Sequence, residues 1–162
     1  MKIELAPDGT VRIGGFNAIQ AYRIARKMEN DGIAFYENVR GTTRDERIKT
    51  AVTVLIDSEK KHRSFFEDAL EKSNARSDNG FEEDDIVDYV SSNVFENADK
   101  KEARTVLDDA RSVVALGAEF EKKAIAFYSA LLQHTDDAES QKALRVIINE
   151  ERQHLETFNR LL

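Results

Sequence analysis

The sequence predicts an all-α protein, an antiparallel four-helix bundle with a long crossover between its second and third helices and a short hairpin at its N-terminus. Three observations lead to this prediction. The 162 residues include one Pro and seven Gly, and 34% are charged residues of both signs, a composition typical of helices with solvated outer faces. Apolar residues recur at helical spacing in four long segments. Residues 17–70 also recur as residues 109–162 with a constant offset of 92, so the bundle should consist of two copies of one helical hairpin.

Residues 1–15 are the only segment with the alternating pattern of strands. Apolar residues alternate on both sides of Pro7, Asp8 and Gly9. In such a turn Pro fixes φ and Gly supplies a positive φ. We therefore expect a hairpin over residues 1–15. Because two strands alone are marginally stable, this hairpin should lie on the bundle or pair with another chain.

Four helices and one crossover account for the rest of the chain. Asn17 can cap the first helix, and Thr43 with Glu46 has the spacing of a capping box at the start of the second. The short connection between these helices makes them antiparallel neighbours. The long connection has the length of a crossover between the two ends of a bundle and includes a short amphipathic segment at residues 85–95. The predicted helices span residues 17–40, 43–73, 109–133 and 135–162, and the crossover spans residues 74–108.

The offset of 92 also repeats a pattern of ligand-type side chains. Each half contains one Glu-x-x-His motif, and a lone Glu stands thirty residues ahead of it. Residues three apart on a helix share one face, so a carboxylate and an imidazole can reach one point in space. Folding each half into a helical hairpin sets the lone Glu at the height of the motif. The offset pairs Glu29 with Glu121, Glu59 with Glu151, and His62 with His154.

These six side chains fall on the apolar stripes of their helices, where an isolated carboxylate costs several kcal/mol. Arg and Lys are missing from the inner stripes, so divalent cations are the natural counter-charge. Four carboxylates and two neutral imidazoles suit two octahedral first-row metals with open positions, whereas zinc takes fewer ligands in a closed tetrahedron. The ligand types are compatible with two iron ions, with manganese or with a mixed pair. A single Glu-x-x-His motif is more often a solvated surface pair, but six residues under one offset favour a di-metal site.

Tyr36 and Tyr128 lie seven residues after the lone glutamates and therefore on the same helix faces. Two roles are open for them: donors of a hydrogen bond that orients a ligating carboxylate, or ordinary core packing. His134 falls in the predicted turn between the last two helices, and Glu119 and Glu150 are rotated away from the inner stripes. We expect these three side chains to lie at the surface.

Charge and composition exclude several classes of partner and chemistry. The net charge of −7 and the pI near 5.1 argue against a phosphate-binding surface, so nucleic acid is not an expected partner. The absence of Cys excludes disulfides, thiolate chemistry, iron–sulfur clusters and a rubredoxin-type iron site. No apolar run approaches the roughly 18 residues of a membrane span, and no signal-peptide pattern follows Met1. We therefore expect a soluble, cytoplasmic protein that does not enter a membrane.

The ligand pattern, one Glu from each of two helices and Glu-x-x-His from each of the other two, resembles that of the ferritin-like di-iron carboxylate superfamily. Residues 28–37 and 120–128 are similar to the Glu-to-Tyr signature of its rubrerythrin branch, and the likeness covers about 110 of the 162 residues. The resemblance implies a ferritin-like fold in which Glu59 and Glu151 bridge two irons. It also implies terminal ligation by Glu29, Glu121, His62 and His154. The sequence departs from rubrerythrins in two ways: the Cys-free chain carries no C-terminal rubredoxin domain, and Ala118 stands where rubrerythrins have an additional carboxylate.

The same resemblance implies a di-iron oxidoreductase that reduces hydrogen peroxide or dioxygen with electrons from a separate donor protein. Three alternatives stay open: a ferroxidase or iron-binding protein, a non-catalytic helical interaction protein that metal holds together, and a di-metal oxygenase with an apolar pocket beside the metals. We expect a homodimer and not a ferritin-type cage, with residues 1–15 and 74–108 as candidate subunit interfaces.

Overall fold

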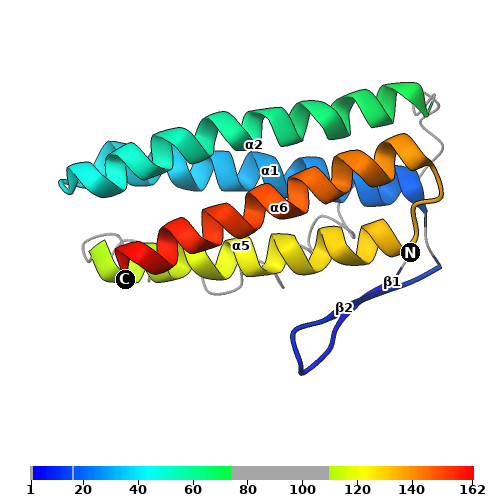
Figure 1. Ribbon diagram of the computed structural model, residues 1–162, viewed down its shortest axis with the longest axis horizontal. Helices are drawn as coiled ribbons and strands as arrows, with labels where there is room; N and C mark the ends of the chain where they lie inside the picture. The colour runs from blue at the N-terminus through cyan, green and yellow to red at the C-terminus, as the bar shows by residue number, and fades with distance from the viewer. Residues whose placement is uncertain (1, 16, 74–109) are drawn as a thin grey trace.

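Four long helices and one β-hairpin make up the computed structural model, which describes residues 2–15, 17–73 and 110–162. The elements are β1 (Lys2–Leu5), β2 (Val11–Gly14), α1 (Ala18–Thr42), α2 (Glu46–Lys72), α5 (Ala110–Gln133) and α6 (Ala138–Leu161). The four helices run side by side along one long axis, and the hairpin lies beside α5 (Figure 1). The predicted all-α four-helix bundle with an N-terminal hairpin is confirmed. The predicted crossover at 74–108 and its short helix at 85–95 lie outside the described residues.

The hairpin forms around the turn that the sequence predicted. β1 and β2 pair antiparallel, with Ile3 opposite Ile13. Gly9 has a φ of 83°, a left-handed conformation that Gly adopts without steric cost. Asp8 Oδ1 accepts a hydrogen bond from the Thr10 N–H at 3.0 Å and so closes the turn. Ile13 is buried in the apolar core of the bundle, and β2 contacts α5. The hairpin therefore packs on its own bundle, which is one of the two predicted arrangements.

Two helices begin three residues later than predicted, because Asp45 and Asp137 cap them. At the start of α2, Asp45 Oδ1 accepts a hydrogen bond from the Arg47 N–H at 2.9 Å. At the start of α6, Asp137 Oδ2 accepts one from the Ser140 N–H at 2.7 Å. A carboxylate at this position also interacts favourably with the positive end of the helix dipole. Asp45 and Asp137 correspond under the offset of 92, so the two helical hairpins turn in the same way.

Two apolar clusters fill the bundle and leave a polar band between them. The hairpin cluster contains Tyr22, Phe66, Tyr128, Leu131 and Ile13 of β2, among others. The distal cluster contains Tyr36, Ile48, Val114 and Phe158, among others. On each helix the predicted ligands separate the members of one cluster from those of the other; on α1, Glu29 follows Met28 of the hairpin cluster and precedes Ile33 of the distal cluster. Apolar side chains therefore close the polar band toward both ends of the bundle.

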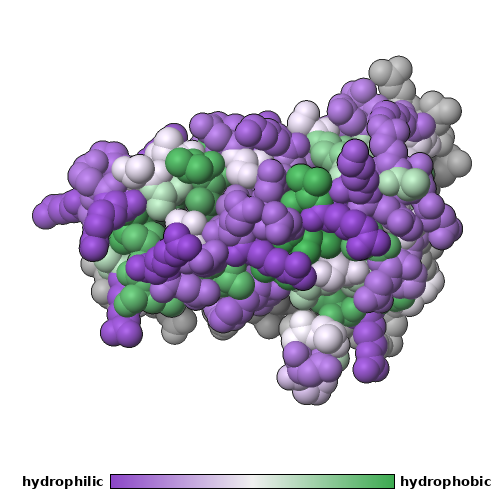
Figure 2. Space-filling model, in the orientation of Figure 1, coloured by the Kyte–Doolittle hydropathy of each residue, from purple (hydrophilic) through white to green (hydrophobic). Residues whose placement is uncertain are grey.

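The face of the bundle that α2 and α6 present is mainly hydrophilic. Hydrophilic residues cover most of the face that α2 and α6 present in Figure 2, and apolar residues appear on it in small patches. Large apolar side chains with high exposure include Val54, Val146 and Leu162. None of the described helices is long and apolar enough to cross a membrane.

Candidate metal centre

Six buried side chains from all four helices meet at the middle of the bundle. Each is at most 7% exposed, and they are the six that the sequence predicted: Glu29, Glu59, His62, Glu121, Glu151 and His154. The buried residues of the described chain include no Lys and no Arg. Within the described ranges, the two imidazoles are therefore the only buried side chains that can carry a positive charge beside the four carboxyl groups.

The six residues form two overlapping groups of potential metal ligands. In each group, one ligand atom per residue can be chosen so that all of these atoms lie within 4.8 Å of one another. One group is Glu29, Glu59, His62 and Glu151, and the other is Glu59, Glu121, Glu151 and His154. The offset of 92 exchanges the two groups, and Glu59 and Glu151 belong to both. The arrangement therefore offers two adjacent positions that share two carboxylates.

The Nδ1 atom of each imidazole faces the carboxylates. His62 Nδ1 lies 2.9 Å from Glu59 Oε2 and 3.2 Å from Glu151 Oε1. His154 Nδ1 lies 2.9 Å from Glu151 Oε2 and 3.2 Å from Glu59 Oε1. The two rings are stacked, with centroids 5.9 Å apart. Each imidazole thus makes the same contacts with the shared pair of carboxylates, as expected for two copies of one half-site.

These contacts determine the protonation of the metal-free site. Burial opposes the charged form of both imidazoles, but the surrounding carboxylates outweigh it and raise the pKa of His62 to about 11 and that of His154 to about 12. Burial likewise opposes the charged form of Glu59, but interactions with both imidazoles lower its pKa to about 2. Burial raises the pKa of Glu29 and of Glu121 well above the usual range. The imidazoles of the metal-free protein are therefore cations, and a metal that binds Nδ1 must displace a proton.

Two buried carboxylate oxygens support a fit to metal ions. Glu59 Oε1 and Glu121 Oε2 have no hydrogen-bond partner among the described residues. The single proton on His154 Nδ1 faces Glu151 Oε2 at 2.9 Å, so Glu59 Oε1, 3.2 Å from the same nitrogen, makes an ion-pair contact without a hydrogen bond. An unpaired buried carboxylate oxygen is costly, and a cation removes that cost. Ligand atoms at right angles around an ion about 2.1 Å away are about 3 Å apart, close to the observed Nδ1–oxygen distances of 2.9 and 3.2 Å. The oxygen-rich donor set with two imidazoles fits divalent first-row metals.

The sequence matches the family model described as Rubrerythrin over residues 23–162. The chain belongs to the rubrerythrin family. This match places the protein in the ferritin-like di-iron superfamily, and the matched residues include all six side chains of the buried site. No curated protein and no solved structure matches the chain.

Two tyrosines connect the two repeated halves of the site. The Tyr36 hydroxyl donates a hydrogen bond to Glu121, and the Tyr128 hydroxyl donates one to Glu29. Each tyrosine thus binds the lone Glu of the other half. Burial raises the pKa of both hydroxyls well above 10.0, so both keep their protons. Each tyrosine thus donates a hydrogen bond to a predicted ligand, and its ring also packs in one of the apolar clusters on either side of the site.

Glu150 lies at the surface, as predicted, but it also makes a contact with the buried site that the sequence did not predict. The His62 Nε2–H donates a hydrogen bond to Glu150 Oε2 at 2.7 Å, and the Glu150 side chain is 39% exposed. Glu150 precedes Glu151 on α6 and reaches toward α2, a contact that the apolar pattern of one helix does not reveal. His134 and Glu119 are exposed, as predicted.

Proposed function

We propose that this rubrerythrin is a di-iron oxidoreductase that reduces hydrogen peroxide or dioxygen with electrons from a separate donor protein. The observation that carries the proposal is the sharing of Glu59 and Glu151 between two groups of potential ligands. A carboxylate has two oxygens and can bridge two ions, so the sharing supports a pair of metals. The terminal ligands would be Glu29 and His62 at one position, and Glu121 and His154 at the other.

Reduction of hydrogen peroxide to two water molecules consumes two electrons and two protons, and a bound pair of ferrous ions supplies both electrons when it becomes ferric. The residues of the chain serve this reaction in three ways. The four carboxylates provide negative charge that favours the higher oxidation state. The two apolar clusters exclude bulk water from both ends of the site. Tyr36 and Tyr128 hold the terminal glutamates in place and keep their hydroxyl protons.

Two observations favour a second candidate, a ferroxidase or iron-binding protein that takes Fe²⁺ as its substrate. These 162 residues contain no Cys, so they include no rubredoxin-type iron site that could deliver electrons. Ala118 is buried in the distal cluster and offers no carboxylate at the position where the family has an additional one. Both features are compatible with oxidation of Fe²⁺ by dioxygen without a dedicated reductant.

The metal content of protein prepared without chelator, followed by anaerobic loading with Fe²⁺ and rapid mixing with peroxide or air, tests the proposal. We expect about two irons per chain. Oxidation that is faster with peroxide than with air, and that can be repeated after re-reduction, supports the oxidoreductase. Fast oxidation by air followed by release of iron from the site supports the ferroxidase.

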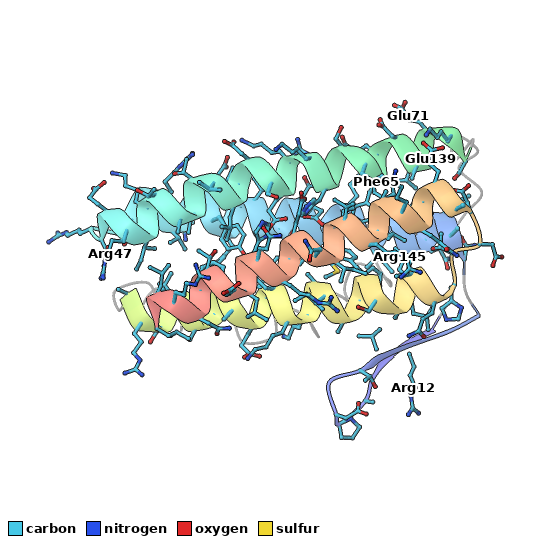
Figure 3. All side chains as sticks on the ribbon, viewed as in Figure 1. Arg12, Arg47, Phe65, Glu71, Glu139 and Arg145 are labelled. Atoms are coloured by element: carbon cyan, nitrogen blue, oxygen red, sulfur yellow. The ribbon has the colours of Figure 1, made fainter. Side chains whose placement is uncertain are left out.

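The variant Glu59→Ala with Glu151→Ala removes both shared carboxylates and should abolish uptake of the metal pair. Its matched control is Glu71→Ala with Glu139→Ala, which removes two exposed glutamates from the same two helices (Figure 3). Unchanged metal content in the first variant would show that the metals do not bind at this site. The homodimer, the separate donor protein and the cytoplasmic location stay predictions of the sequence.

A further inference from the structure

The two halves of the site differ at the outer edge of their imidazoles. Both His62 and His154 direct Nδ1 toward the shared carboxylates. Only His62 is held at its other nitrogen as well, because Nε2 donates to Glu150 Oε2 at 2.7 Å. No side chain of the described residues makes an equivalent hydrogen bond with His154 Nε2. The two half-sites therefore differ in the hydrogen bonding of their imidazoles.

One pair of equivalent positions in the repeat accounts for this difference in hydrogen bonding. Under the offset of 92, Glu150 corresponds to Ser58 on α2. Each residue directly precedes a shared carboxylate, and both are half-buried. The Ser58 side chain is two carbon–carbon bonds shorter than that of Glu150. The His154 side chain is 8% exposed, against 2% for His62, as expected if Glu150 covers one imidazole and Ser58 leaves the other less covered.

A carboxylate on the far nitrogen of a ligating imidazole has known physical effects. It fixes the rotation of the ring, so that the near nitrogen points at the metal, and it makes that nitrogen a stronger base. Loss of such a partner typically weakens metal binding by about 10-fold to 100-fold. Because Glu150 is 39% exposed, water screens its charge. The main effect should therefore be the orientation of the ring.

We propose that Glu150 is a positioning residue that makes the Glu29, Glu59, His62 and Glu151 group the tighter of the two metal positions. This group fills first, and the group with Glu121 and His154 fills second. The inference rests on the proposed function, because it assumes that metals bind at the two groups. It adds that the two positions have unequal affinity and assigns the cause to the pair Ser58 and Glu150.

Calorimetric titration of the metal-free full chain with Co²⁺, without oxygen, tests the inference independently of activity. We expect two binding steps whose affinities differ by roughly 10-fold to 100-fold. His62→Ala should remove the tight step, and His154→Ala should remove the weak step. Glu150→Ser copies the other half and should weaken the tight step by roughly 10-fold to 100-fold, so that the separation between the two steps narrows by the same factor.

Transfer of the carboxylate to the other half provides the sharper test. Glu150→Ser combined with Ser58→Glu should restore two separate steps, with the tight step now removed by His154→Ala. Glu150→Gln keeps an oxygen that can accept the Nε2–H bond, so it should retain most of the separation if ring orientation is the cause. Glu156→Ser, a loss of exposed negative charge on the same helix, should leave both steps unchanged. Circular dichroism and urea unfolding of each metal-free variant show whether the fold is intact.

Several results would overturn the inference. Unchanged separation in Glu150→Ser would show that this residue does not determine the order of filling. If the tight step of the Glu150→Ser and Ser58→Glu double variant is still removed by His62→Ala, the carboxylate does not determine the order of filling either. If Glu150→Gln loses as much separation as Glu150→Ser, the positioning role is wrong. If the wild-type protein takes up no Co²⁺, the proposed metal site itself fails. Two wild-type steps of equal affinity would instead leave the metal site in place and overturn only the inferred difference between the two positions.

Discussion

Replacement of Gly117 by alanine should destabilise the bundle through Phe158. A Cβ at Gly117 would lie 2.6 Å from Phe158 Cζ and 2.8 Å from its Cε1, whereas carbon atoms pack best at about 3.5 to 4.0 Å. The ring must therefore move by about 1 Å. Phe158 is 1% exposed, and its ring packs on Tyr36 with centroids 5.7 Å apart. Because the ring cannot move into solvent, it must displace Tyr36, which donates a hydrogen bond to Glu121.

The size of the effect follows from two opposing terms. Overpacking in a filled core costs about 1 to 3 kcal/mol, and replacing Gly by Ala in a helix gains up to about 1 kcal/mol. Gly41→Ala is the matched control, because Gly41 is exposed on α1 and an added Cβ meets no atom within 4 Å. Gly41→Ala therefore gains helix propensity without a steric clash. Gly117→Ala should therefore be about 1 to 3 kcal/mol less stable than Gly41→Ala.

Urea unfolding of the metal-free variants measures this difference directly. Thermal unfolding should give a Tm about 2 to 12 °C lower for Gly117→Ala, since 1 kcal/mol corresponds to about 2 to 4 °C in a chain of this length. The displaced Tyr36 should also weaken metal binding at the group that contains Glu121. If Gly117→Ala proves as stable as Gly41→Ala, the Phe158 ring can move freely, and the description of a tightly filled distal cluster is wrong.

Two further predictions concern the charges and hydrogen bonds of the site. The metal-free protein should lose stability as the pH rises, because the pKa values of His62 and His154 are raised to about 11 and about 12 from about 6.5 in the unfolded chain. Their contribution to the free energy of unfolding is complete below about pH 6.5 and is lost as the pH rises toward about 11. Urea unfolding should therefore show a lower midpoint at about pH 9.5 than at about pH 6. Equal midpoints would contradict the raised pKa values of the two imidazoles. Tyr128→Phe leaves the buried Glu29 without its hydrogen-bond donor and should cost about 1 to 3 kcal/mol. Tyr22→Phe, in the same apolar cluster, is its control in urea unfolding, and an equal loss in both variants would show that the hydrogen bond to Glu29 contributes little.

The helices and the six buried residues could be predicted from the sequence because both depend on local patterns. Apolar residues at helical spacing identify the inner face of each helix without reference to its neighbours. A Glu-x-x-His motif places two side chains on one face for the same reason. The repeat then provides an internal check, because Glu59 and Glu151 occupy equivalent positions in two independent segments. The helix starts were less predictable, since Thr43 and Asp45 are both good capping residues and only the folded backbone decides between them.

The contacts between helices could not be predicted in this way. Tyr36 lies on the same face as Glu29, yet it donates to Glu121 on α5. Glu150 lies off the inner stripe of α6, yet it accepts a hydrogen bond from His62 on α2. Both pairings depend on the rotation and crossing of one helical hairpin relative to the other. The packing of side chains along the whole contact determines that geometry, and no periodicity within a single helix encodes it.

The repeat also separates the residues that maintain the site from the residue that distinguishes its halves. Two identical half-sites must have equal intrinsic affinities, so any difference in intrinsic affinity must arise where the halves differ. The side chains that make the polar contacts of the buried band are identical in both halves, as are two phenylalanines that pack on its tyrosines: the six predicted ligands, Tyr36 and Tyr128, and Phe66 and Phe158. The difference between Ser58 and Glu150 lies at the half-buried edge, where a change of side chain alters the surroundings of one imidazole and leaves the core packing intact. A symmetric fold can thus hold two metal positions of unequal affinity, because the difference is located outside the positions that the fold requires to be the same.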